Sequence, residues 1–504
     1  MGMKSLLCAG IALALIAPWP AHADEADDLA GIRREIDELK ASYEARIRAL
    51  EARLEQLQKS AAGTAAAPAV PASASAPAST SASAPASTSA SASAPAPVPA
   101  SASAQAQPST PAPASPIPAG RGEPPRQAAG ANAFNPAISL ILSGLYTSTS
   151  QDPANYAITG FPVPEGTEVG PGERGLSLAE SELAISASID PYLRGALRLA
   201  LEPDNSVAVE EAFIQTTGLS RGVTIKAGRF LSGIGYLNEQ HRHYWDFVDS
   251  PLAYQAFLGS QFGDDGVQLR WLAPTDTFVE FGAEIGGGRA YPATGSRGNG
   301  AGSGAVYAHL GGDAGPSNAW RAGLSLLQAS PRDQVTTVTG PAGDPVSNSF
   351  SGRSRLWLAD LVWKWAPDGN PARRNFKLQA EYLRRQQSGE LVYALDGAAI
   401  PGAFDTTQSG WYLQGVYQFM PRWRLGLRTE RLATGSQSFA AQGIVVGAPD
   451  YAPSRNSAMI DFSPSEFSRF RLQFARDKSR QDAPDNQIFL QYQTNLGAHG
   501  AHQI

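Results

Sequence analysis

The sequence predicts an all-β transmembrane fold, an antiparallel outer-membrane β-barrel of about 16 strands preceded by an α-helical coiled coil and a disordered linker. Three observations predict this architecture. Apolar and polar residues alternate in successive segments of residues 134–504, and long and short connections between those segments alternate along the chain. Charged residues make up only 17% of the 504 residues, below the ~25% that is usual in soluble domains.

Residues 1–23 have the features of a secretory signal peptide. Lys4 precedes an apolar run at 6–16, and Ala21-His22-Ala23 provides small residues for cleavage, so we expect the mature chain to begin at Asp24. The apolar run is shorter than the ~20 residues that a membrane-spanning helix needs. Removing the signal peptide also removes Cys8, the single cysteine, which excludes disulfides, thiol catalysis and cysteine-bound metals.

Residues 24–60 are expected to form a self-associating coiled coil. An isolated solvated helix is the alternative, but a polar helix with so narrow an apolar seam would be marginally stable on its own. The number of helices in the coiled coil stays open, and a homotrimer would suit the barrel that follows. The seam residues recur every three or four positions and are Leu29, Ile32, Ile36, Leu39, Tyr43, Ile47, Leu50, Leu54 and Leu57.

Residues 61–133 consist mostly of Ala, Ser, Pro and Thr. Few side chains are large enough to offset the entropy of ordering the backbone, so we expect a disordered tether. At ~3.1 Å per residue such a segment reaches on the order of 200 Å. A mucin-like stalk is the alternative use of this composition.

Residues 134–504 are expected to form the barrel. The segments LRGALRLAL at 193–201 and WRLGLR at 423–428 place apolar residues on one strand face and polar or small residues on the other. A soluble β-sandwich would show the same alternation. The connections favour the barrel, because brief links such as 190–192 alternate with long ones such as 230–264 and 386–409, as in barrels with short periplasmic turns and long external loops.

A sheet that faces lipid has to close on itself, because an open edge would leave peptide groups without hydrogen-bond partners in hydrocarbon. Aromatic residues near the segment ends, such as Trp363, Trp411 and Trp423, are typical of the girdles at membrane interfaces. We therefore expect the protein in the cell outer membrane, surrounded by outer-membrane lipid and inserted by the barrel-assembly machinery. An even number of strands would leave the N-terminal segment in the periplasm.

The expected lumen face carries a set of cationic side chains, for which two interpretations stay open. They pair with carboxylates on neighbouring strands, or they form a positive wall that sorts small solutes or ions by charge. No basic surplus suggests nucleic acid as a partner, because 40 basic residues stand against 46 acidic ones. The predicted pore-lining residues are Arg194, Arg198, Arg270, Lys377, Arg424, Arg428, Arg469 and Arg471.

The long connection at 230–264 is expected to fold into the barrel and narrow it, because it is rich in aromatic and polar residues. The predicted constriction residues are Tyr236, Glu239, His241, His243, Trp245, Asp246 and Asp249. Among them His241, His243, Glu239 and Asp246 are candidate ligands of a zinc ion, against the alternative of ordinary hydrogen-bonded histidines. His499 and His502 form a second, weaker pair.

No catalytic residues are expected. The segment GLSRG at 218–222 has the spelling of a nucleophile elbow, but a strand-like segment follows it where that chemistry needs a helix. It is interpreted as a glycine-rich turn.

Four segments resemble a known family: NPAISLILSG at 135–144, KAGRF at 226–230, GYLNE through WDFVD at 235–249, and DGVQLRW at 265–271. They are similar to a proteobacterial porin-like family commonly labelled zinc-regulated TonB-dependent outer membrane receptors, and more distantly to phosphate-selective porins. The resemblance implies zinc-linked uptake. The sequence departs from true TonB-dependent receptors, because coiled coil and tether stand where a globular plug would be and about 16 strands fall short of 22.

Three functions are compatible with the sequence. The first is a porin-like channel for diffusion or uptake of small solutes or ions, with the coiled coil serving for oligomerisation or anchoring. The second is a zinc-linked receptor that binds a metal or chelate through the connection at 230–264. The third is an envelope tether whose barrel only anchors the coiled coil.

Overall fold

The structure, a computed structural model, describes residues 136–295, 298–339, 345–395, 398–440 and 450–497. The expected signal peptide, coiled coil and linker, as well as His499 and His502, lie outside the described residues. The strands are β1 (Ala137–Thr149), β2 (Gly175–Ser188), β3 (Leu193–Leu201), β4 (Val207–Thr216), β5 (Val223–Leu231), β6 (Gly263–Leu272), β7 (Phe278–Gly286), β8 (Ser303–Asp313), β9 (Asn318–Ala329), β10 (Gln334–Thr339), β11 (Pro345–Trp365), β12 (Asn375–Leu395), β13 (Ala398–Met420), β14 (Trp423–Phe439), β15 (Ser454–Ser465), β16 (Ser468–Lys478) and β17 (Asp485–Gly497). The helices are η1 (Pro153–Asn155), η2 (Arg242–Tyr244), α2 (Leu252–Leu258) and η3 (Pro367–Gly369).

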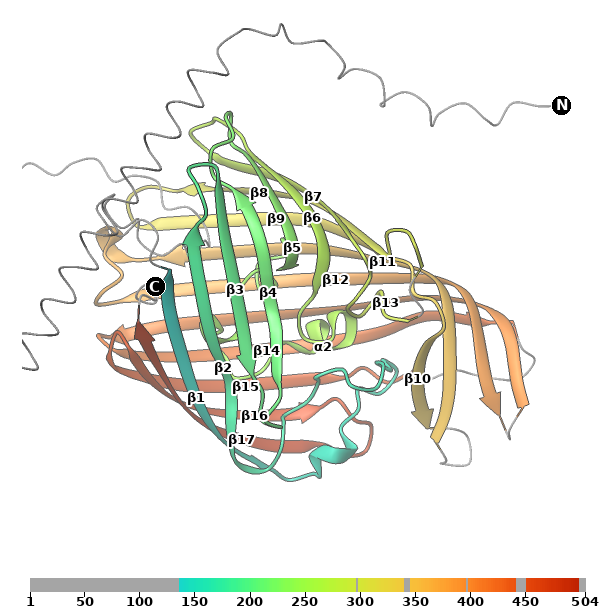
Figure 1. Cartoon of the computed structure of the whole chain (residues 1–504). Coiled ribbons are helices and arrows are strands. Elements are labelled where there is room, and N and C mark those ends of the chain that lie inside the picture. The colour runs from blue at the N-terminus through green and yellow to red at the C-terminus, as the bar shows by residue number, and fades with distance from the viewer. Residues whose placement is uncertain (1–135, 296–297, 340–344, 396–397, 441–449, 498–504) are drawn as a thin grey trace, which may run out of the picture. The chain divides into compact units, whose positions relative to one another are not determined.

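The strands form one antiparallel sheet that closes on itself (Figure 1). β1 pairs with both β2 and β17, and β9 pairs with β11, so the ring has no open edge at these strands. β10 pairs with β11 alone, outside the ring. Of the 17 strands that the described residues contribute to the sheet, 16 therefore make up the closed barrel, which confirms the predicted barrel and its strand number.

The two rims of the barrel differ in their connections. Ser139 of β1 pairs with Gly497 of β17, so the barrel begins and ends at the same rim. That rim, which we call the short-turn rim, carries brief connections such as 189–192 and 421–422. The opposite long-loop rim carries 150–174 and 232–262. The even strand number produces this arrangement, as the alternating connection lengths predict.

The strands β11, β12 and β13 have 21, 21 and 23 residues, about twice the 9–11 that cross a membrane. They continue past the long-loop rim, where β10 joins them (Figure 1). The expectation of a long connection at 386–409 is therefore wrong, since most of these residues are in strands. A small apolar cluster that includes Phe350, Leu391 and Phe404 supports the extension.

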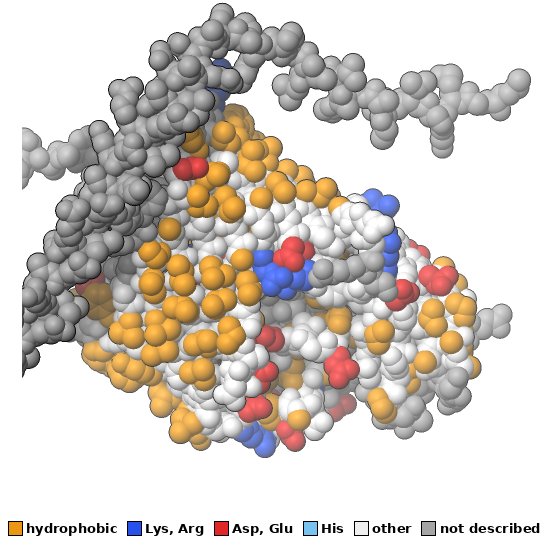
Figure 2. All heavy atoms as spheres, in the orientation of Figure 1, with side chains coloured by type: hydrophobic (Ala, Val, Ile, Leu, Met, Phe, Trp, Pro, Cys, Tyr) orange, Lys and Arg blue, Asp and Glu red, His pale blue; other side chains and the backbone are white. Residues whose placement is uncertain are grey.

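The outer face of the barrel is apolar. Leu361, Leu413 and Leu427 are 47%, 40% and 61% exposed, and each alternates along its strand with buried residues. Figure 2 shows hydrophobic side chains covering much of the visible face of the strands. An apolar surface of this kind around a closed ring fits an outer-membrane barrel. Among the described residues, none of the helices has the length and apolar character needed to cross a membrane.

Candidate functional site

Residues 232–262, which connect β5 and β6, lie inside the barrel. We call them the inner segment. Ile234, Leu252 and Phe257 of this segment are fully buried and belong to one apolar cluster with Leu358 and Leu383 of the barrel wall. Helix α2 packs against β12, β13 and β14 within the ring (Figure 1). The inner segment therefore occupies space that a 16-stranded barrel would otherwise leave to water.

Two local features fold the inner segment back on itself. The Asn238 side chain donates hydrogen bonds to the carbonyl oxygens of Ser232 and Phe262 and accepts one from the amide of Phe262, all at 2.8 Å. This one buried amide thus joins the two ends of the segment. Gly259 ends α2 with φ of 64°, a left-handed conformation that glycine adopts without a steric penalty.

Glu381 on β12 holds the first half of the inner segment. Its carboxylate accepts hydrogen bonds from the hydroxyl groups of Tyr254 at 2.7 Å and Tyr412 at 2.5 Å, and from the amide of Leu237 at 3.0 Å. Burial and the neighbouring Glu381 raise the pKa of Tyr254 well above its ordinary value, so this phenol keeps the proton that it donates. A carboxylate with this many donors is satisfied although it is fully enclosed.

Glu430 on β14 holds the second half. It accepts hydrogen bonds from the amide of Leu252, at the start of α2, and from the guanidinium groups of Arg428 and Arg455. Those two arginines also form ion pairs with Asp249 of the inner segment at 2.8 and 2.6 Å. Burial alone would raise the pKa of Asp249, but Arg428 and Arg455 outweigh it and lower the pKa to about 2.

The predicted pore-lining cations are paired in the structure rather than free. Arg198 forms ion pairs with Glu182 and Glu211, and Arg270 with Glu239. Lys377 and Arg424 pair with Asp246, and Arg424 and Arg471 pair with Asp461. Arg469 donates to the carbonyl oxygen of His243 and to Gln493, and Arg194 donates to Ser186.

For Arg198, Arg424 and Arg471 this geometry matches the interpretation of the lumen cations as partners of carboxylates on neighbouring strands. The inner segment supplies further carboxylates, because Glu239, Asp246 and Asp249 reach the cationic wall. The other predicted constriction residues, Tyr236, His241, His243 and Trp245, are all buried within the barrel.

His241 and His243 lie beside acidic residues that the sequence did not associate with them. His241 Nδ1 is 3.0 Å from Glu210, its Nε2 is 3.2 Å from Glu211, and His243 Nδ1 is 3.1 Å from Glu182. The two imidazole rings stack with centroids 5.7 Å apart.

The two histidines differ in charge. Burial and Arg198 lower the pKa of His241, but Glu210 and Glu182 outweigh them and raise it to about 10, so this imidazole is cationic at neutral pH. Burial lowers the pKa of His243 in spite of the neighbouring Glu182, so this imidazole is neutral.

The four predicted zinc ligands do not form one cluster. Glu239 pairs with Arg270 and Arg321, and Asp246 pairs with Lys377 and Arg424, each away from a histidine partner. In an irregular segment, residues close in sequence point toward different parts of the wall. The donor atoms that do come together, within 4.8 Å of one another, belong to Glu182, Glu210 and His241.

A β-bulge explains why sequence reasoning missed Glu210 and Glu211. Arg198 pairs with Glu211 and the next residue, Leu199, pairs with Val209, so Glu210 is an extra residue in β4. The bulge lets two successive carboxylates approach His241, which a regular strand forbids. Glu430 was detectable, because it shares the even-numbered lumen face of β14 with Arg424 and Arg428.

Comparison with known proteins gives one relative and several similar folds. No protein-family model matches the chain. An uncharacterized protein of Aquifex aeolicus (strain VF5) is 31% identical over 391 residues, which cover 73% of this chain and 80% of that protein.

Solved structures with a similar fold cover 72% of the chain. A loop-deletion mutant of OmpT, an outer membrane protein of Vibrio cholerae, has 10% identity, a TM-score of 0.45 and 100% of its own chain covered. The outer membrane channel DcaP of Acinetobacter baumannii has 10% identity, a TM-score of 0.42 and 97% of its chain covered. An anion-selective porin from Comamonas acidovorans has 11% identity, a TM-score of 0.44 and 99% of its chain covered.

Proposed function

We propose that this chain, which belongs to the same protein family as the uncharacterized protein of Aquifex aeolicus, is a porin-like channel, not an enzyme, that passes small solutes or ions across the outer membrane. The observation that carries the proposal is the closed 16-stranded ring with apolar side chains outside and charged side chains inside. In hydrocarbon such a ring satisfies all its peptide groups and presents the face that lipid solvates. The charged interior supplies a polar path.

The inner segment makes the proposed channel a constricted one. It is held on several sides of the bore, by Glu182 on β2, Arg270 on β6, Glu381 on β12 and Glu430 on β14. Because carboxylates and guanidinium groups pair in the bore, the lumen has no single-sign field. We expect low conductance with weak selectivity by charge.

Conductance of the purified full chain in a planar lipid bilayer tests this function. The expected result is a small steady current that increases when Glu430→Gln loosens the inner segment. Arg373→Gln, an exposed residue at the short-turn rim, is the matched control and leaves the current unchanged. A complete absence of current from the wild-type chain and from Glu430→Gln would reject the channel.

A second candidate function is binding of a divalent metal such as zinc by the inner segment. The observation that favours it is the approach of Glu182, Glu210 and His241, whose carboxylate and imidazole donors suit zinc. Two features oppose it. The His241 imidazole is cationic at neutral pH and has to lose a proton before it binds a metal, and the Arg198 guanidinium lies 2.5 Å from its Nε2, which leaves only Nδ1 as a donor.

Calorimetric titration of the detergent-solubilised full chain with zinc chloride tests the metal site. Wild-type protein is expected to bind one ion, and Glu210→Gln and His241→Ala are each expected to abolish binding. Glu239→Gln, whose side chain contacts Arg270 instead, serves as the control. Binding that survives His241→Ala contradicts this site.

We also propose that the chain assembles as a homotrimer through the coiled coil expected at residues 24–60, with its N-terminal segment in the periplasm. The support is the heptad pattern alone. Light scattering of the full chain and of a chain lacking residues 24–60 tests it, with trimer and monomer as the expected masses. Equal masses for the two chains contradict the role of the coiled coil. A trimer that carries no current in the bilayer experiment would favour an envelope tether over a channel.

A further inference from the structure

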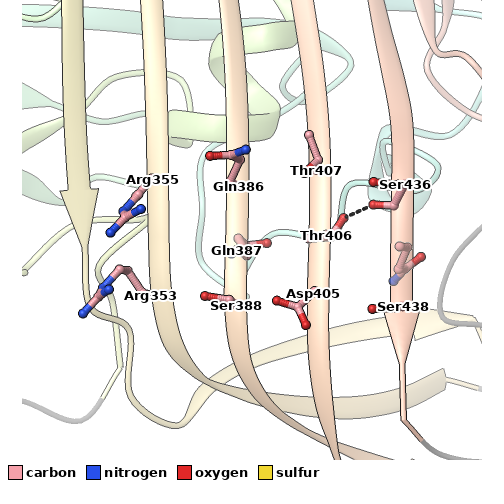
Figure 3. Close-up of a pocket in the computed structure, with 11 residues that line it drawn as sticks. Arg353, Arg355, Gln386, Gln387, Ser388, Asp405, Thr406, Thr407, Ser436 and Ser438 are labelled. Atoms are coloured by element: carbon pink, nitrogen blue, oxygen red, sulfur yellow. Dashed lines mark hydrogen bonds between the residues drawn. The ribbon is translucent and has the colours of Figure 1, made fainter.

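A polar cavity of about 350 Å³ lies on strands β11 to β14, near the long-loop rim (Figure 3). Arg353 and Arg355 of β11 line it on one side, and Gln386, Ser388 and Thr407 of the next two strands continue it. Figure 3 shows these side chains on adjacent strands of one sheet surface.

The arginines of this cavity point away from the lumen. Arg353 and Arg355 are exposed, whereas Leu356 and Leu358 are buried in the cluster that contains the inner segment. Because successive side chains of a strand lie on opposite faces, the odd-numbered residues of β11 face outward. The next outward residue after Arg355 is Trp357, which is 43% exposed.

A row of aromatic side chains marks the edge of the apolar outer face that lies toward the long-loop rim. Trp357 on β11, Tyr382 on β12 and Trp411 on β13 are all exposed on it. The strand register places Arg384 opposite Trp357 and Arg431 opposite Trp411, and both arginines are exposed. Aromatic rows of this kind lie at the level of lipid headgroups.

These outward arginines have no partner among the described residues, in contrast to the arginines inside the barrel. Arg353, Arg355, Arg384 and Arg431 form no hydrogen bond or ion pair with any residue that the structure describes. Arg424, Arg428 and Arg455 in the lumen all pair with carboxylates. The outer arginines therefore have free donors in the plane where an anionic headgroup lies.

We propose that this outer patch, defined by Arg353, Arg355, Arg384 and Arg431, binds the phosphorylated saccharide headgroup of a glycolipid in the outer leaflet. The proposal rests on the proposed membrane location of the barrel. Guanidinium groups bind phosphate with paired hydrogen bonds. Gln386, Ser388 and Thr407 supply donors and acceptors for sugar hydroxyls, and Asp405, the one carboxylate lining the cavity, accepts from a hydroxyl and keeps the phosphate on the arginine side.

Native mass spectrometry of the full chain in detergent, titrated with diphosphorylated lipid A, tests the proposal. The wild-type chain is expected to bind the lipid, and the double variant Arg355→Gln/Arg384→Gln is expected to bind it at least about tenfold more weakly, since hydrogen bonds to charged groups are lost. Arg373→Gln/Arg374→Gln removes the same charge from exposed positions beyond the opposite ends of the same strands and is expected to bind like the wild type.

Three results would overturn the proposal. They are equal binding by the wild type and the Arg355/Arg384 variant, equal loss in the Arg373/Arg374 variant, or displacement of the lipid by inorganic phosphate at the lipid's own concentration. Heat-dependent gel mobility verifies that each variant is folded. Bilayer conductance separates this proposal from the channel proposal, because the outward substitutions leave the lumen unchanged and should leave the current unchanged.

Discussion

Asp249 of the inner segment and Arg455 of β15 form an ion pair at 2.6 Å inside the barrel, although half of the strands of the ring separate them from each other in sequence. Arg455 is 1% exposed and also binds Glu430, which in turn accepts a hydrogen bond from the amide of Leu252. One guanidinium thereby fixes the inner segment to the wall.

Arg455→Ala is expected to destabilise the barrel and to increase conductance. The substitution leaves Asp249 and Glu430 buried with one cation fewer, and removal of one partner from a buried pair costs about 3–5 kcal/mol. Unfolding in urea, followed by tryptophan fluorescence, measures the loss. Arg353→Ala, an exposed arginine on the outer face, is the control with no change in stability; equal loss in both variants would contradict the anchoring role.

Acid is expected to loosen the inner segment through Asp249. The pKa of this carboxyl is lowered from 3.8 to about 2 in the folded chain, so its ionised form stabilises folding by about 2 kcal/mol. That contribution is complete above pH 4 and is lost as the pH falls through about 2. As the pH falls from 4 to about 2, the free energy of unfolding of Asp249→Asn should decrease less than that of the wild type. Parallel pH profiles of the two proteins would exclude the carboxyl as the source.

Gly235→Ala is expected to displace the inner segment from Glu381. Gly235 has φ of 67°, and an added Cβ would lie 2.6 Å from a Glu381 oxygen and 2.8 Å from the Tyr254 hydroxyl. Strained backbone and overpacking each cost about 1–3 kcal/mol. Gly144→Ala, where a Cβ meets nothing within 4 Å, is the matched control. Urea unfolding compares the stabilities of the two variants. If Gly235→Ala is as stable as the wild type, the site accommodates the added methyl group and the prediction is wrong.

Leu413→Arg is expected to destabilise the barrel in a lipid bilayer by about 1–2 kcal/mol, because the cost of a cation on the lipid face is about 2–4 kcal/mol at mid-membrane and decreases toward the interface. Leu413 is 40% exposed and adjoins Trp411 on the outer face of β13. Leu219→Arg, an exposed leucine in the turn between β4 and β5, should cost little. Refolding into lipid vesicles measures both, and equal effects would argue against a lipid-facing β13.

The barrel was predictable because its signal is local. Each strand contacts lipid on one face and the lumen on the other, so the period-two pattern of β14, from Trp423 to Arg428, carries the orientation directly. The alternation of long and short connections predicted the two rims of the barrel in the same way, because each connection length is also a local feature of the sequence. The extensions of β11 to β13 were missed, because strands that stand outside the membrane lose the apolar side of that pattern.

The candidate site was only partly predictable. Residue types placed the inner segment at 230–264 and selected His241, Asp246 and Asp249, since an aromatic and charged connection of that length suits a folded interior. Their partners were not predictable, because Glu210 faces His241 only through a bulge. A bulge changes the face of a side chain without leaving a pattern in the sequence.

The amino-acid sequence by itself determined that a chain with a two-residue apolar period closes into a ring of about 16 strands, because lipid and water act on each strand separately. Only the tertiary structure decided that most of the predicted lumen cations pair with carboxylates. The carboxylates of Asp246 and Asp249 reach Arg424 and Arg455 only when the inner segment folds across the bore, and such pairing depends on the position of the whole segment in space.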